Sequence, residues 1–137
     1  RNVGVGNKKV YYYRRNNNQS ATAKFNIEKY RNGEKSLDTI KKNIISPSQK
    51  IEEMYLLHKS LFSLGAMVKI IENKCKKQYK DDYNRYKICL RENLKSILSS
   101  KSISFYRKCL LLNGLCFPWL VSKIDIYRRK KIQNASV

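Results

Sequence analysis

The sequence predicts a mainly α-helical, extended protein: a long helix, a second helix, a short C-terminal helical core and a basic N-terminal arm. Three observations favour this fold class. Apolar residues recur at spacings of three and four over long stretches, which is the period of one helix face. Helix-capping patterns precede several of these stretches. Neither a β-hairpin signal nor an internal repeat interrupts them.

Residues 1–24 form the basic arm, in which cations alternate with tyrosines and no acid occurs. Tyrosine rings can stack on unpaired bases while Lys and Arg bind phosphates, so this composition suits single-stranded RNA. An edge strand or a disordered tail is the alternative for the same segment. The arm residues expected to bind RNA are Lys8, Lys9, Tyr12, Arg14 and Arg15.

Residues 25–80 are expected to form a helical extension, with a short helix at 36–44 and a long helix at about 47–78. The long helix is indicated by Ser46 as its cap, Pro47 in its first turn and Gln49 three residues after the cap. His58 falls on or beside the apolar face of this helix. We expect it to be buried or partly buried with a backbone partner, because no second titratable group accompanies it at a catalytic spacing.

Residues 81–137 are expected to form a helical, RNA-binding C-terminal region. Asp81-Asp82 can cap the second helix, and a third helix is predicted at 102–112. Asn113-Gly114 would end that helix, because both residues tolerate the left-handed conformation of a C-terminal cap. Ser122, three residues before Asp125, would then cap a final cationic helix.

The charge is the strongest indication of a partner. Thirty Lys and Arg against ten Asp and Glu leave a net charge of +20, which repels itself unless something anionic neutralises it. Nucleic acid is the leading partner, because each phosphate contact releases a counterion. An anionic membrane surface is the second possibility. No apolar run approaches the ~18 residues of a membrane-spanning helix, so we expect no transmembrane insertion.

Catalytic chemistry is not expected. The chain has one histidine, and its adjacent acid pairs point away from one another on a helix, so no nucleophile, base and orienting group can be assembled. The four cysteines lack metal-site spacing and are expected to be half-buried reduced thiols. We therefore predict no enzyme activity, no metal, no cofactor and no small-molecule substrate.

The C-terminal third carries a set of short motifs. Arg107-Lys108-Cys109 precedes Asn113-Gly114, Ser122-Lys123-Ile124 leads to Tyr127-Arg128, and Ala135-Ser136-Val137 ends the sequence. Over residues 92–137 this order resembles the fourteenth protein of the small ribosomal subunit, in bacterial numbering, and especially its mitochondrial members. The sequence departs from the family pattern at Leu115 and Lys123, which replace arginines, and at Val137, which replaces a tryptophan.

The resemblance implies a structural constituent of the ribosome that braces the small subunit, without an active site. Ribosomal RNA and neighbouring ribosomal proteins would be its partners. By this resemblance the RNA contacts are Arg107, Lys108, Lys123, Arg128 and Arg129, and Lys130 and Lys131 continue the same cationic helix. An acid-free N-terminal segment and residues with AT-rich codons favour a mitochondrial ribosome. Another organellar or a cytoplasmic ribosome is the alternative.

Two other classes of function stay open. One is a non-ribosomal DNA-binding or viral nucleoprotein module, in which the long helix dimerises and the arm wraps DNA. The other is a membrane-active cationic helical protein that inserts residues 110–120 into lipid. The single tryptophan, Trp119, lies between Pro118 and Leu120, and we expect it to anchor the core rather than to stack on a base.

Overall fold

The computed structural model describes residues 25–134, so the predicted basic arm at 1–24, with its five expected RNA contacts, lies outside the described residues. Within the described part the chain is helical and contains no strand, which confirms the mainly α prediction. The helices are α1 (Ile27–Asn43), α2 (Gln49–Glu72), α3 (Lys80–Ser99), α4 (Phe105–Cys116) and α5 (Pro118–Asn134).

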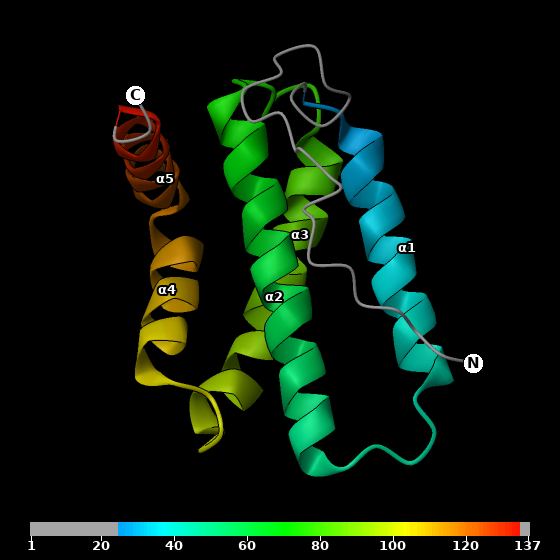
Figure 1. The fold of residues 1–137 in the computed structure, drawn as a ribbon. Coiled ribbons are helices and arrows are strands. Elements are labelled where there is room, and N and C mark those ends of the chain that lie inside the picture. The colour runs from blue at the N-terminus through cyan, green and yellow to red at the C-terminus, as the bar shows by residue number, and fades with distance from the viewer. Residues whose placement is uncertain (1–24, 135–137) are drawn as a thin grey trace, which may run out of the picture.

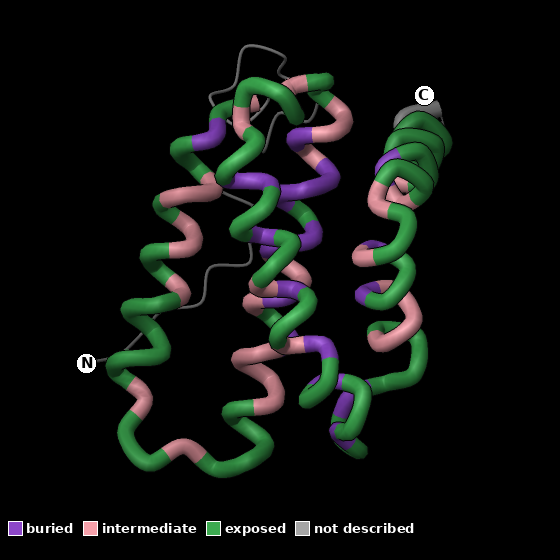
Figure 2. The backbone as a smooth tube through the Cα atoms, turned by 180° about the vertical axis from the view of Figure 1, so that it is seen from behind, coloured by how far each residue is buried: buried purple, intermediate pink, exposed green. Residues whose placement is uncertain are grey.

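The antiparallel pair of α2 and α3 forms the centre of the molecule, with α1 on one side and α4 and α5 on the other (Figure 1). The core lies along this pair, where buried residues of both helices face one another (Figure 2). Apolar side chains removed from water provide its main driving force. The largest fully buried side chains are Tyr86, Leu57, Met67, Ile70, Leu90, Ile97 and Leu111.

The long helix starts close to its predicted position but is shorter. Ser48, rather than Ser46, is the cap, and its hydroxyl accepts a hydrogen bond from the Ile51 amide at 3.4 Å. The helix ends at Glu72 instead of about residue 78, because Lys74 adopts a positive φ of 57° and turns the chain toward α3. A lysine in this region of φ breaks helical geometry.

The first helix is longer than predicted. It begins at Ile27, where the Asn26 side chain accepts a hydrogen bond from the Glu28 amide at 2.9 Å, instead of at residue 36. Gly33 allows this helix to lie against α2, because a Cβ at that position would be 2.6 Å from Phe62 Cζ. Ile27 is the one buried residue of α1.

Charged pairs attach α1 to its neighbours. Arg31 donates to Asp82 of α3 at 2.8 Å and 3.1 Å, and Arg85 bonds both Asp82, at 2.7 Å, and Glu34, at 3.1 Å. Asp82 was expected to cap α3, but it lies inside the first turn and is buried. Arg31, followed by the charge of Arg85, holds the pKa of the Asp82 carboxyl below its usual range.

The predicted turn at Asn113-Gly114 is wrong. Helix α4 continues to Cys116, and Gly114 is buried where α4 crosses α2, because a Cβ there would overlap the Leu64 side chain. The break falls at Phe117, and Pro118 opens α5, the helix position where proline's missing amide costs least. The chain bends by 119° between α4 and α5.

Three single-residue expectations also fail. Ser122 is buried within α5 rather than capping it. His58 is exposed, because it lies on the outer side of α2 beside the fully buried Leu57. Trp119 is 52% exposed and is therefore not a core anchor; Lys123 Nζ lies 4.9 Å from its ring.

One helix of the described part, α2, is long and apolar enough to cross a membrane by length and composition, contrary to the expectation that no such run exists. Half of that stretch is buried by the other helices. The central helix of a water-soluble bundle has the same properties, so this is weak evidence for a membrane span.

Alanine substitutions at two glycines inside helices should change the stability of the protein in opposite directions. Gly65 has open space where a Cβ would stand, so Gly65→Ala should stabilise the protein by about 0.5–1 kcal/mol through helix propensity. Gly114→Ala should destabilise it by about 1–2 kcal/mol, because the methyl group would displace buried Leu64. Urea denaturation measures both. Equal stabilisation by the two variants would contradict the described contact of α4 with α2.

The stability that the Asp82 ion pairs give to the packing of α1 should depend on pH. The pKa of Asp82 is depressed in the folded state, so its stabilising effect is present above a pH of about 4 and is lost as pH falls below that value. Asp82→Asn should lower stability at neutral pH by about 1–3 kcal/mol, since the buried carboxylate bonds two partly exposed arginines. Below pH 4 the wild type should approach the variant in thermal unfolding. A constant difference across this range would refute the ion-pair account.

Candidate nucleic-acid interface

Exposed cations from two distant parts of the sequence gather at one end of the bundle. The connection between α2 and α3 contributes three lysines and the first residue of α3 a fourth, and the last part of α5 lies at the same end (Figure 1). We call this surface the cationic end. Its residues are Lys74, Lys76, Lys77, Lys80, Arg128, Lys130 and Lys131, all of them exposed.

A carboxylate near the end of α2 fixes this arrangement. Glu72, whose side chain is 8% exposed, pairs with Lys69 of its own helix at 2.7 Å and with Arg129 of α5. Arg129 also pairs with Asp125 at 3.1 Å. Burial alone would raise the pKa of Glu72, but the hydrogen bonds from Lys69 and Arg129 outweigh burial and keep that pKa below its ordinary value. We call this group of ion pairs the Glu72 clamp.

The start of α1 lies within electrostatic range of the same clamp. Burial raises the pKa of the Tyr30 hydroxyl, the charge of Glu72 raises it further, and the charge of Arg129 opposes both. At the neighbouring corner the rings of Phe25 and Tyr79 meet edge to face with centroids 5.9 Å apart. The starts of α1 and α3 and the ends of α2 and α5 therefore converge.

Most acids at this end are neutralised inside the protein. Glu28 and Asp82 pair with Arg31, and Glu72 belongs to the clamp. Asp81, in the first turn of α3, is an exposed acid among the seven cations. Within residues 25–134 no carboxylate pairs with a cation of the cationic end. This surface consequently presents a strong positive potential to an anionic partner.

The structure separates the C-terminal residues that were predicted to bind RNA. Arg128, Lys130 and Lys131 are on the cationic end, whereas Arg129, although its side chain is 47% exposed, is paired with Glu72. Arg107 and Lys108 lie at the start of α4, at the opposite end of the bundle (Figure 1).

Lys108 and Lys123 have contacts within the protein. Lys108 Nζ donates to the carbonyls of Leu98 and Ser100, at 2.8 Å and 2.5 Å, and so caps the C-terminus of α3. Lys123 lies over the ring of Trp119. Arg107 is exposed. The four lysines of the α2–α3 connection and the start of α3 were not predicted as contacts, although their crowding at positions 74–80 is visible in the sequence as a signal.

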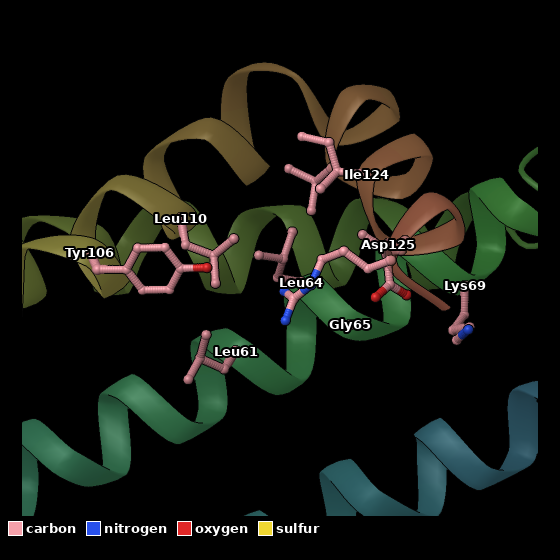
Figure 3. Close-up of a pocket in the computed structure, with 11 residues that line it drawn as sticks. Leu61, Leu64, Gly65, Lys69, Tyr106, Leu110, Ile124 and Asp125 are labelled. Atoms are coloured by element: carbon pink, nitrogen blue, oxygen red, sulfur yellow. The ribbon is translucent and has the colours of Figure 1, made fainter. Parts of the chain in front are cut away.

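An open groove lies between α2, α4 and α5 (Figure 3). Its volume is about 340 Å³, and its lining is mainly apolar, including Leu61, Leu64 and Leu110. The charged groups at its edge offer no acid–base pair, because Lys69 and Asp125 already bond members of the Glu72 clamp. Arg128 of the cationic end also lines the groove, so the groove adjoins that surface.

Metal-binding side chains do not cluster in the part of the chain that the structure describes: no three His, Cys, Asp or Glu residues come together there. All four cysteines are free thiols. Cys75, Cys89 and Cys109 are half-buried, as expected, but Cys116 is exposed.

Comparison with known proteins finds no relative. No family model matches the chain, and no curated protein or solved structure is similar to it. The resemblance of residues 92–137 to a ribosomal family therefore rests on short motifs, and the motif expected to form a turn at Asn113-Gly114 lies inside α4.

Arg129 and Lys130 are neighbours with different environments, and their substitutions should separate the two roles. Arg129→Gln removes one partner of nearly buried Glu72 and should destabilise the protein by about 1 kcal/mol, a value reduced by the exposure of the arginine. Lys130→Gln should change stability by less than about 0.5 kcal/mol, because Lys130 is exposed. Urea denaturation of both variants gives the comparison. Identical midpoints would contradict the clamp.

Proposed function

We propose that this protein binds RNA through the cationic end and serves as a structural, non-enzymatic component of a ribonucleoprotein particle, the small subunit of a mitochondrial ribosome. The observation that carries the proposal is the convergence of seven exposed cations from the α2–α3 connection, the first residue of α3 and the last part of α5, beside acids that are paired internally.

Phosphate is the group that this surface suits best. Lysine ammonium groups act as point charges and arginine can bind two phosphate oxygens at once. Every phosphate that they neutralise releases condensed counterions, which favours binding without any reading of sequence. Tyr127, which is exposed beside Arg128, adds a ring on which an unpaired base can stack. A structural RNA contact needs no more than this.

The DNA-binding alternative is less well supported. It requires the long helix to dimerise, but Leu57, Leu64, Met67 and Ile70 of α2 are already buried by other helices of the same chain. No comparable apolar face of α2 is left for a second copy. The ribosomal assignment is supported by the C-terminal motifs and the high Lys content of the sequence.

Salt-dependent RNA binding tests the proposal. The quadruple variant Lys74→Gln, Lys76→Gln, Lys77→Gln, Lys80→Gln should weaken binding to a ribosomal RNA fragment and reduce the slope of log affinity against log salt by up to about 3. The matched control replaces four exposed lysines elsewhere, namely Lys35, Lys50, Lys87 and Lys95.

The control variant has the same net charge as the quadruple variant of the cationic end, but it keeps all the cations of that end. Its salt slope should fall by less than about 1, since general attraction is screened over ~8–10 Å at moderate ionic strength. Equal losses in the two variants would show that total charge, rather than the cationic end, governs binding, and would overturn the proposed site.

A further inference from the structure

Exposed apolar side chains are concentrated on α4 and α5. Of the fifteen large hydrophobic residues that are exposed in the described part, ten lie between Phe105 and Ile132. Such a concentration on one side of a small domain is typical of an interaction surface rather than of scattered surface hydrophobics. We call the exposed apolar surface that runs along α4 and onto the start of α5 the apolar elbow. It consists of Phe105, Leu112, Cys116, Phe117, Trp119 and Leu120.

Helix α4 is apolar on two opposite faces. One face buries Leu111 and Gly114. The other carries Phe105, Leu112 and Cys116, at spacings of seven and four that place them on one side of the helix. This outer face points away from α2 and α3, because α4 and α5 form the edge of the bundle opposite α1 (Figure 2). The apolar residues of this outer face therefore do not pack in the core of the protein.

The bend brings aromatic and cationic groups together. Phe117 stands at the break, 51% exposed, and α5 then leaves at 119° to α4. On α5, Trp119, Lys123 and Tyr127 follow one another at spacings of four, so they share the exposed face. Lys123 Nζ lies over the Trp119 ring at 4.9 Å. A tryptophan beside a lysine is the pairing that favours the boundary between lipid headgroups and acyl chains.

Charge limits what can cover the elbow. The surrounding cations include Lys101 and Arg107, whereas Asp125, the single acid of residues 101–132, pairs with Arg129. A second copy of the chain would bring another net charge of +20 against this surface. The partner must therefore combine an apolar layer with negative charge at its edge.

We propose that the apolar elbow docks on the surface of an anionic lipid bilayer. Phe117, Trp119 and Leu120 enter the headgroup–acyl boundary, and Lys123 extends to the lipid phosphates. Taken together, α4 and α5 are long and apolar enough to resemble a membrane span that is broken in the middle. Arg128, Lys130 and Lys131 on the same helix favour a position in the interface instead, because charges at the bilayer centre are costly.

Intrinsic fluorescence can test this docking on the whole protein, because Trp119 is the only tryptophan. Adding mixed phosphatidylcholine–phosphatidylglycerol vesicles should shift its emission to shorter wavelength, and brominated acyl chains should quench it. Pure phosphatidylcholine vesicles should have a much smaller effect, and high salt should weaken the response. No shift and no quenching with the anionic vesicles would overturn the proposal.

Matched variants assign the effect to the elbow. Phe117→Ser with Leu120→Ser should weaken vesicle affinity by about tenfold or more, because both apolar groups leave the lipid boundary. Ile45→Ser with Ile88→Ser removes two side chains that are 89% and 46% exposed on other parts of the surface, and should bind vesicles as the wild type does. Equal behaviour of the two double variants would refute the assignment.

Vesicle binding by the apolar elbow can be distinguished experimentally from RNA binding by the cationic end. The elbow variant should keep wild-type affinity for RNA, and vesicle binding by the wild type should survive ribonuclease. A fluorescence shift that depends on protein concentration without vesicles would instead assign the elbow to self-association and overturn the lipid proposal.

Discussion

The Glu72 clamp is the interaction on which the arrangement of the charged surface depends. A carboxylate that is almost removed from water must be paired, and here it holds Lys69 of its own helix and Arg129 of α5. Because Arg129 is fixed to the end of α2, its neighbours Arg128, Lys130 and Lys131 lie beside the α2–α3 connection. Arg129, paired with both Glu72 and Asp125, thus keeps the exposed cations beside it at this end of the bundle.

The scarce acids of the chain have a consistent role. Asp82 joins α3 to α1, Glu53 accepts a 2.6 Å hydrogen bond from Ser100 between the ends of α2 and α3, and Glu72 joins α2 to α5. Each of these carboxylates connects two helices. The many cations that lack such a partner are left on the surface, where their mutual repulsion favours an anionic ligand. The fold therefore explains how so basic a chain can pack while most of its cations stay exposed.

The sequence predicted the fold where local signals were strong. Residues 46–49 carry a cap, a proline and a glutamine, and α2 begins there. Long-range contacts decided the rest. Gly114 follows Asn113 as in a helix cap, yet it is a glycine because Leu64 packs against it. Likewise, nothing in the sequence distinguishes Arg129 from its cationic neighbours. Its pairing with Glu72, 57 residues away, is visible only in the structure. The lysines of the α2–α3 connection needed the position of α5 before they formed a site.

Two surfaces result: the cationic end, for which we propose RNA binding, and the apolar elbow along α4 and its bend into α5. The most direct measurement of the central claim is gradient sedimentation of tagged wild-type protein and its quadruple lysine variant from a mitochondria-enriched lysate, with and without ribonuclease. The wild type should migrate with the small ribosomal subunit, ribonuclease should abolish this co-migration, and the variant should stay near the top of the gradient. Migration as a free species, regardless of ribonuclease, would contradict this claim.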